Sequence, residues 1–448
     1  MKKKLLSVLL ATAMTAGLLA GCGSSPTGAA EGGASEAALS GESEVAEEAA
    51  AGKAVTLKTV SMFGGTDPNA PVYEAIIEQY EKDNPNVTVE DSSATADNEW
   101  KASVVADFSV GNEPDVLQFF TDAQSSNIIA TDKLMTLEEI RAEYPDYAKD
   151  TLETALAGVT NPDGVQRAVP TTGFSEVLYC NKDLFDQYGL ELPTDWDSLT
   201  TAVKTFKENG VIPIAVSLNN IPYYWIEAFV LYSAGLDSYQ SLPEIAPAEW
   251  VAGLENFKTL RDMGAFPEDT DTVDNDYVGE LFKSKQAAMQ LDGTWYAGGI
   301  EDKENTVAVA FPGVPDQKAE AGTITSGFSS GFYITRKAWE DPAKREAAVK
   351  FVMAQTSKEA VSQYWAKGGY VNKCATEVST TETLTPLAQS IADVNAAAGN
   401  NFAGPIDSRM DAEAFTNIVN SICDISTGAA NTEDVLNDAL ELNASRAE

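Results

Sequence analysis

The chain has 448 residues, and its 30 lysines and arginines against 68 aspartates and glutamates give a formal net charge of −38. A chain this acidic is a poor candidate for binding nucleic acid, because that affinity depends on cationic groups that meet phosphates. The absence of histidine excludes Ser-His and Cys-His nucleophilic pairs, histidine acid–base chemistry and the usual zinc sites.

Residues 1–21 have the pattern of a secretory signal peptide. Three lysines precede an apolar run from Leu5 to Ala20, and Gly21 and Cys22 follow. The run has about 16 residues, fewer than the roughly 20 that a membrane-spanning helix needs, so we expect it to be cleaved off. Cys22 directly after Leu-Ala-Gly resembles the bacterial lipobox, in which the mature chain begins at the cysteine and carries acyl chains on it. The alternative is an ordinary export signal that leaves Cys22 as a free thiol.

Residues 22–53 consist mainly of Gly, Ala, Ser and Glu and contain no aromatic residue. Such a segment cannot bury enough apolar surface to offset its ordering entropy, which predicts a disordered tether. As a flexible chain it would span on the order of 30 Å. Its acidic residues would be repelled by anionic lipid, which favours holding a globular body away from a membrane surface.

The remaining residues, 54–448, predict a globular body that is too long for one hydrophobic core and long enough for two domains. Its three cysteines, Cys180, Cys374 and Cys423, are widely spaced and odd in number. They therefore imply no obligatory disulfide framework.

The first part of this body alternates strands and helices. The pattern predicts a strand at 55–63, a helix through 72–80, a strand at 87–90, a helix through 100–108 and a strand at 114–120. Interleaved strands and helices indicate βαβ units and a mostly parallel sheet with helices on both faces. Ligands of such sheets bind beyond the carboxyl ends of the strands, where Phe63, Phe119, Phe120 and Asp122 lie.

The second part of the body repeats this alternation. We expect strands at 176–180, 211–216 and 287–291, and helices that open at 181–185, follow 194, cover 225–234 and 250–257, begin at 341–342, and cover 386–398, 410–423 and 432–444. Thr194 is expected to cap its helix, with Asp197 as the acid of a capping box. Asp341 followed by Pro342 is the preferred start of a helix, a cap and then proline.

An acidic loop at 269–276, with Glu280 eleven positions after Asp269, superficially suggests a calcium loop. Val273 and Asp274 occupy the positions of an oxygen ligand and of the required glycine. We therefore expect a solvated acidic loop that caps the next helix, and no metal site.

Five segments carry a family resemblance: VLYCNKDLF (177–185), LPTDWDSL (192–199), QAAMQLDGTW (286–295), FSSGFYIT (328–335) and DPAKREAAVKFV (341–352). In this order and spacing they resemble a family 1 extracellular solute-binding protein. Members of this sugar class are the substrate receptors of ATP-driven importers, similar in outline to maltose-binding protein. The resemblance covers nearly the whole body.

The resemblance implies two α/β lobes, each a mostly parallel sheet flanked by helices, joined by three hinge crossings. By these motifs the crossings lie near 169–171, 325–331 and 368–373, lobe 1 comprises 54–170 and 326–370, and lobe 2 comprises 171–325 and 371–448. The ligand would lie between the lobes and be buried by hinge closure.

A sugar ring has an apolar C–H face and a rim of hydroxyls, so aromatic rings can cover its face while carboxylates and amides bind its edge. By the resemblance, the candidates are Phe63, Phe119 and Asp122 in lobe 1, and Glu176, Trp225 and Trp295 in lobe 2. Phe120 is the alternative to Phe119, because alternate residues of a strand face opposite ways and either ring could lie in the hydrophobic core. Cys180 stands where many relatives have a tyrosine, and no tryptophan stands at the end of the strand at 114–120, so a smaller or different ligand remains an alternative to a large oligosaccharide.

These features together predict an exported lipoprotein, anchored through Cys22 to the outer face of the cell membrane. It would bind a neutral mono- or oligosaccharide as a monomer and deliver it to the permease of an ABC importer. No catalytic residue and no cofactor are expected. Two alternatives remain: a secreted carbohydrate-active hydrolase, which needs only two positioned carboxylates, and a sugar-sensing surface receptor component.

Overall fold

The structure is a computed structural model that describes residues 53–447. The predicted signal peptide (1–21), the anchor residue Cys22 and nearly all of the predicted tether (22–53) lie outside these residues and stay predictions. Within the described part of the chain, no helix has both the length and the apolar character needed to cross a bilayer.

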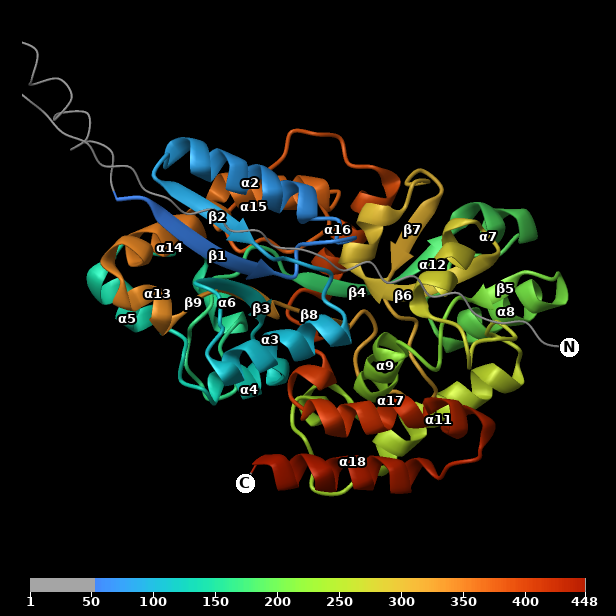
Figure 1. The fold of residues 1–448 in the computed structure, drawn as a ribbon. Coiled ribbons are helices and arrows are strands. Elements are labelled where there is room, and N and C mark those ends of the chain that lie inside the picture. The colour runs from blue at the N-terminus through green and yellow to red at the C-terminus, as the bar shows by residue number, and fades with distance from the viewer. Residues whose placement is uncertain (1–52, 448) are drawn as a thin grey trace, which may run out of the picture. The chain divides into compact units, whose positions relative to one another are not determined.

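The first of two sheets has four strands in the order β2-β1-β3-β9. They are β1 (Val55–Ser61), β2 (Val87–Asp91), β3 (Val116–Phe120) and β9 (Ser330–Ile334). β1 runs parallel to β2 and β3, which are joined by helices, whereas β9 comes from much later in the chain and runs antiparallel to β3. The prediction of an α/β fold is confirmed (Figure 1).

Helices cover both faces of the first sheet. One face packs against α2 (Ala70–Asp83), α14 (Pro342–Gln355) and α15 (Lys358–Lys367), and the other against α3 (Asn98–Val110) and α4 (Ser126–Ile129). The connecting segments form short helices: η1 (Ala123–Ser125), α5 (Leu137–Glu143), α6 (Glu153–Gly158) and α13 (Arg336–Glu340). Burial of one apolar stripe on each long helix is what holds these layers together.

The second sheet has six strands, in the order β10-β8-β4-β6-β5, with β7 also paired to β4. They are β4 (Phe174–Asn181), β5 (Ile212–Ile214), β6 (Ala287–Gly293), β7 (Thr306–Val309), β8 (Ile324–Gly327) and β10 (Phe402–Ala403). β4 is antiparallel to β6, β7 and β8, while β5 is parallel to β6 and β10 to β8.

The prediction of a mostly parallel sheet is therefore wrong for this half of the body. Parallel strands need a crossover connection, but a connection that contains helices does not by itself make the two strands parallel. Helices separate β4 from β5 and β5 from β6, yet β5 is parallel to β6 while β4 runs antiparallel to β6, β7 and β8. Alternation of strands and helices in a sequence does not reveal which strand enters from the opposite end.

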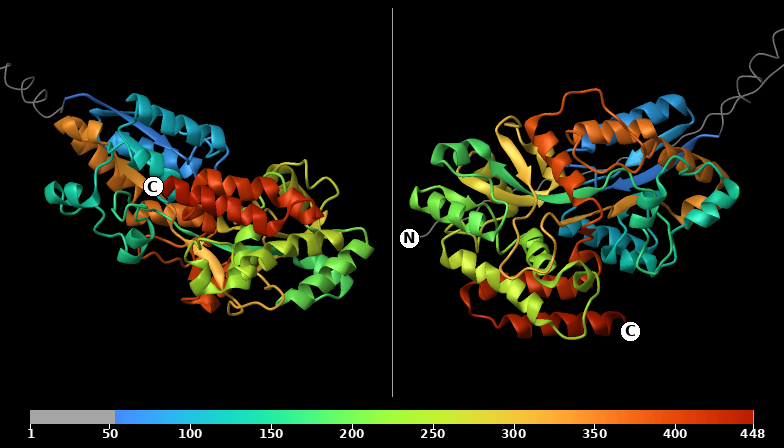
Figure 2. Two further views of the ribbon diagram at one scale, coloured as in Figure 1. Left: turned by 90° about the horizontal axis from the view of Figure 1, so that it is seen from below. Right: turned by 180° about the vertical axis from the view of Figure 1, so that it is seen from behind.

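Helices also cover both faces of the second sheet. The larger core lies under α7 (Lys182–Tyr188), α8 (Trp196–Glu208), α9 (Tyr223–Ala234), α10 (Leu236–Tyr239), α11 (Ala248–Asp262), α17 (Ala412–Thr427) and α18 (Thr432–Ala447). The smaller core lies under α12 (Asn275–Lys283), η2 (Thr294–Gly299) and α16 (Pro386–Ala398). Figure 2 shows α17 and α18 packed against each other on the outside of this half.

Several helices begin after a residue whose side chain accepts a hydrogen bond from the backbone of the first turn. Asp341 accepts a hydrogen bond from the backbone N–H of Ala343, which confirms the predicted start of α14. Asp274 from the acidic loop likewise caps α12. The predicted cap of α8 is wrong by one residue: Asp195, and not Thr194, accepts from the backbone of Ser198. The Ser198 hydroxyl in turn accepts a hydrogen bond from the backbone N–H of Asp195. Ser198 therefore takes the place in the capping box that Asp197 was expected to fill.

The chain passes between the two sheets where several segments lie side by side. Val169 pairs with Phe332 of β9, Thr172 pairs with Cys374, and two residues separate β8 from β9. The backbones approach so closely that a Cβ on Gly173 would lie 2.3 Å from the carbonyl oxygen of Gly327. Only glycine fits at that point.

Candidate ligand-binding cleft

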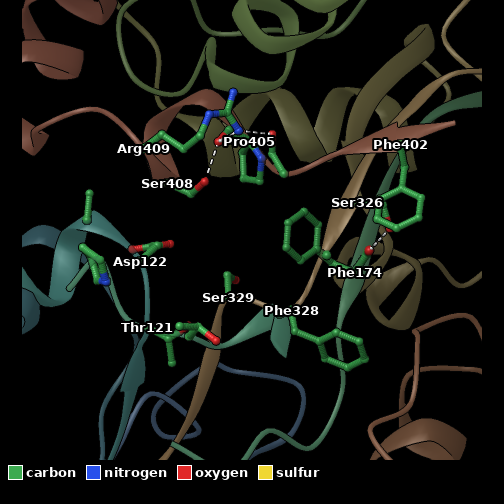
Figure 3. Close-up of a pocket in the computed structure, with 16 residues that line it drawn as sticks. Thr121, Asp122, Phe174, Ser326, Phe328, Ser329, Phe402, Pro405, Ser408 and Arg409 are labelled. Atoms are coloured by element: carbon green, nitrogen blue, oxygen red, sulfur yellow. Dashed lines mark hydrogen bonds between the residues drawn. The ribbon is translucent and has the colours of Figure 1, made fainter. Parts of the chain in front are cut away.

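A cavity of about 530 Å³ lies where the two sheets meet. Residues from both sheets and from the segments between them line it: Thr121, Asp122 and Ala123 after β3; Phe174, Ser326, Gly327, Phe328 and Ser329 near the crossing; and Phe402, Gly404, Pro405, Ser408 and Arg409 near β10. η1 contacts η3 (Ile406–Ser408) across it. The cavity therefore takes contributions from segments that are far apart in the sequence (Figure 3).

One side of the cavity is aromatic. Figure 3 shows Phe174, Phe328 and Phe402 on the side opposite Asp122. The ring of Phe402 is exposed, and the Nζ atom of Lys373 lies 4.1 Å from its centroid. These three rings were not predicted, although Phe328 begins one of the family segments and Phe174 lies just before another.

Trp295 extends this aromatic side. Its ring is 40% exposed and lies 5.6 Å from the ring centroid of Phe174 and 5.9 Å from that of Tyr224. The indole covers Gly293 so closely that a Cβ there would lie 2.2 Å from it. The structure thus places the predicted Trp295 against Phe174 of the cavity lining, with Tyr224 of α9 as an unpredicted neighbour, although neither Trp295 nor Tyr224 itself lines the cavity.

Trp225, by contrast, lies in the core of the second half. Its ring is 1% exposed and packs 5.5 Å from Phe229 and 5.7 Å from Phe311. It is not among the residues that line the cavity. α9 is apolar on nearly all sides, so its sequence did not show which of the three adjacent aromatic residues at its start faces the core.

The predicted aromatic residues of the first half are also largely buried. Phe63 packs 5.2 Å from Tyr364, and Phe119 packs 5.3 Å from Trp100 in the core. Phe120 is partly exposed, and the Nζ atom of Lys101 lies 4.7 Å from its ring centroid. None of the three lines the cavity.

Asp122 brings a carboxyl group to the cavity from the end of β3. Its Oδ1 atom accepts from the backbone N–H of Gln124 at 3.0 Å, which fixes the turn into η1. Enclosure by protein atoms, and then the charge of Asp407, raise the pKa of Asp122 to about 8. Enclosure also raises the pKa of Asp407 to about 6, against the nearby charges of Lys101 and Arg409. The two carboxyls come from opposite sides of the cavity and repel each other when both are charged.

The predicted Glu176 lies two residues after Phe174, on the same face of β4. It is buried, and burial raises the pKa of Glu176 to about 8. Burial followed by the charge of Glu176 raises the pKa of Glu227 well above its ordinary value. Burial raises the pKa of Asp292 at the end of β6 to about 7. Acidic groups thus gather behind the aromatic side.

Arg409 is the cation among the residues that line the cavity, and two of its three side-chain nitrogens donate hydrogen bonds, whereas Nε has no partner among the described residues. Nη1 donates to the carbonyl of Gly404 at 2.8 Å and Nη2 to that of Tyr239 at 2.8 Å. The guanidinium also lies over the ring of Tyr239, 4.8 Å from its centroid. Sequence reasoning missed Arg409, Asp407 and Glu227. Glu227 had a usable signal, because it is the one charged residue of an otherwise apolar helix.

The sequence of the chain matches a family model described as bacterial extracellular solute-binding protein over residues 75–395. The chain belongs to this family. The match covers more than half of the chain, and it confirms the resemblance drawn from the five segments.

Curated relatives match part of the chain. It is 23% identical over 211 residues, 44% of this chain and 48% of the relative, to the sn-glycerol-3-phosphate-binding periplasmic protein UgpB of Rhizobium meliloti (strain 1021). It is 25% identical over 211 residues, 44% of this chain and 47% of the relative, to the protein of the same name from Brucella abortus (strain 2308). The chain thus aligns with about half the length of these relatives.

Solved structures match nearly the whole body. A chitin oligosaccharide binding protein superposes with a TM-score of 0.76 at 19% identity, covering 87% of this chain and 98% of its own. Maltose-bound T. maritima MalE3 gives a TM-score of 0.71 at 18% identity, covering 88% of this chain and 100% of its own. At such low identity these similarities show the fold, and they confirm its predicted class.

Proposed function

We propose that this chain is the substrate-binding lipoprotein of an ABC importer and that it captures a carbohydrate in the cavity between the two sheets. One observation carries the proposal: the cavity has aromatic rings on one side and carboxyl and hydroxyl groups on the other. This arrangement suits a sugar, whose ring has an apolar face and a hydroxyl rim. The sugar ligands named for the structural neighbours agree with it.

The proposed contacts revise the predicted set of residues. Trp295, Phe174 and Tyr224 cover the ring faces, and Asp122 accepts hydrogen bonds from hydroxyls. Glu176 supports this surface from behind. Trp225, Phe63 and Phe119 stabilise the cores around the site, because each is buried away from the cavity.

A phosphate-bearing ligand is the competing proposal, since the curated relatives are named for sn-glycerol-3-phosphate. The charges around the cavity oppose it. Asp407, whose pKa of about 6 leaves it charged at neutral pH, would repel a phosphate, and two nitrogens of Arg409 already donate to backbone carbonyls. A neutral polyol needs no such positive charge.

The predicted division into two lobes, 54–170 with 326–370 and 171–325 with 371–448, remains part of this proposal. It is supported by the two separate sheets, each with its own cores, and by the adjacent segments that connect them. Ligand bound between the lobes would be enclosed by rotation about these segments and then presented to the permease. The acyl chains on Cys22 would keep the protein at the outer face of the cell membrane.

A thermal-shift screen tests the proposal. Purified protein is heated with a panel of neutral mono- and oligosaccharides and, separately, with sn-glycerol 3-phosphate. A ligand that binds only the folded state raises the melting temperature, by an amount that grows with its concentration. We expect a neutral sugar to do so and to be recovered intact by chromatography. A response to glycerol phosphate alone would contradict the ligand class, and shortened sugars would establish a hydrolase.

A further inference from the structure

Three successive backbone carbonyls at the end of β3 each accept a hydrogen bond from a side chain. The donors come from β9, from the turn at 161–165 and from η1: Tyr333 donates to Phe120 at 2.9 Å, Asn161 to Thr121 at 3.0 Å, and Ser125 to Asp122 at 2.7 Å. Thr121 and Asp122 line the cavity (Figure 3). The backbone that brings the Asp122 carboxyl to the cavity is therefore fixed by side chains that lie behind it.

The hydrogens of this network can be assigned one by one. Tyr333 has a single O–H hydrogen, which it donates to the carbonyl of Phe120, so its oxygen must accept from the Nδ2 atom of Asn161 at 2.9 Å. The carbonyl of Thr121 can only accept. One hydrogen of Nδ2 thus goes to each of these two partners, with the Ser125 hydroxyl farther away at 3.4 Å. This assignment fixes the orientation of the amide.

Asn161 is itself fixed in place and lies out of reach of the cavity. It is 2% exposed, its backbone N–H donates to the carbonyl of Val165 at 3.1 Å, and its carbonyl accepts from Gly164 at 2.9 Å. Its Oδ1 atom is buried and has no partner among the described residues, so the amide is held through its two N–H groups. Its neighbours Thr160 and Pro162 do line the cavity. Asn161 therefore ties two parts of the cavity wall together.

We propose that Asn161 is a positioning residue of the ligand site, which touches no ligand and holds the end of β3 so that the Asp122 carboxyl stays at the cavity. This inference rests on the proposed function, in which Asp122 accepts hydrogen bonds from sugar hydroxyls. A carboxyl that is fixed before binding loses less conformational freedom when the ligand arrives. The affinity should therefore depend on the network behind Asp122 as well as on Asp122 itself.

The first test compares two buried asparagines. Asn161→Ala removes both N–H donors, and we expect affinity for the sugar found in the thermal-shift screen to fall about tenfold. Asn181→Ala is the matched control: Asn181 is also 2% exposed and donates to two backbone carbonyls, at 2.9 and 2.8 Å. It lies seven residues along β4 from Phe174, about 23 Å away. This control should lower the melting temperature and bind sugar normally in titration calorimetry.

Hydrogen exchange of the empty protein gives a readout that needs no ligand. The backbone N–H groups of Thr121, Gln124 and Ser125 are all hydrogen-bonded, so exchange in peptides covering 119–126 reports on this segment. In Asn161→Ala we expect exchange there to become at least about threefold faster, with wild-type rates at 177–182. Asn181→Ala should leave the rates at 119–126 unchanged.

Tyr333→Phe serves if Asn161→Ala does not fold. It keeps the ring, loses the hydrogen bond to Phe120, and should also speed exchange at 119–126 and weaken binding. Wild-type exchange at 119–126 in the variant used, or an equal loss of affinity in the Asn181 control, would overturn the positioning role. If no sugar binds the wild type, the proposed function fails, while the exchange rates still decide whether Asn161 holds the end of β3.

Discussion

Trp295 and Trp225 show how differently two tryptophans of one site region are held. Trp295 lies half out of the protein, supported by Gly293 beneath it and by Phe174 and Tyr224 at its edges. Trp225, which follows Tyr224 at the start of α9, is enclosed in the core of the second half. Removing the first ring should alter binding, and removing the second should alter stability.

For Trp295→Ala we expect affinity for the bound sugar to fall about tenfold or more, because a stacked ring contributes about 1 kcal/mol or more beyond its buried area. The melting temperature should change little, since the ring is already partly exposed. Titration calorimetry measures the affinity. Trp365→Ala, on α15 and away from the cavity, is the matched control and should bind normally. Unaltered affinity of the Trp295 variant would remove this ring from the site.

For Trp225→Ala we expect the free energy of unfolding to fall by about 3–5 kcal/mol, because a large buried ring is lost and a cavity is left. Urea unfolding of the empty protein measures it. If this variant were as stable as the wild type and bound sugar poorly, Trp225 would be a ligand contact and not a core residue.

At the scale of elements, the segments that join the two sheets are packed backbone against backbone. A Cβ on Gly173 would meet the carbonyl oxygen of Gly327 at 2.3 Å, so Gly173→Ala forces the crossing segments apart. We expect a loss of about 1–3 kcal/mol in the free energy of unfolding, as for other overpacked sites. Gly299→Ala is the control, because its Cβ would meet nothing within 4 Å. A neutral Gly173→Ala variant would show that these segments separate easily.

Most elements could be predicted from the sequence, and the exceptions have physical causes. The helix at 386–398 was predicted to the residue, since proline and glycine mark its ends. The direction of β4 and the facing of α9 could not be predicted, because a strand buried on both faces and a helix apolar on all sides carry no periodic signal. The candidate Trp295 came from the family resemblance and its place in a turn, whereas Glu227, the one charged residue of α9, was overlooked.

At the scale of the whole molecule, acidic groups on opposite sides of the cavity should make the meeting of these two sides depend on pH. The pKa of Asp122 is raised to about 8 and that of Asp407 to about 6 when the two sides meet. A carboxyl whose pKa is raised in a given state favours that state at low pH and opposes it as the pH rises through the raised value. Under the proposed closure, the form in which the two sides meet is therefore favoured at low pH and opposed as the pH rises through about 6 and about 8.

We expect the sugar to bind more tightly at pH 6 than at pH 8, by up to about tenfold for each proton taken up per pH unit. Asp407→Asn removes one of the two charges and should make the affinity less dependent on pH. Asp438→Asn, an exposed position on α18, should keep the wild-type dependence. Calorimetric titrations at both pH values measure the difference, and an identical pH dependence in all three proteins would refute the repulsion.

The proposed anchor makes a prediction for the intact cell. Cys22→Ser removes the thiol that would carry the acyl chains, and the exported protein should then appear in the medium in place of the membrane fraction. Immunoblots of both fractions, with the wild type beside it, decide the matter. Continued membrane association of the variant would reject the lipid anchor.

The two residues between β8 and β9 have a further consequence. Phe328 and Ser329 join one sheet to the other, and both also line the cavity. The carbonyl of Ser329 accepts from the backbone N–H of Thr121, so the same short stretch is tied to the end of β3. In the proposed closure, a ligand that contacts this stretch would also contact backbone that has to bend as one half turns against the other. Ligand binding and closure would then be linked directly through this segment, without a relay of side chains.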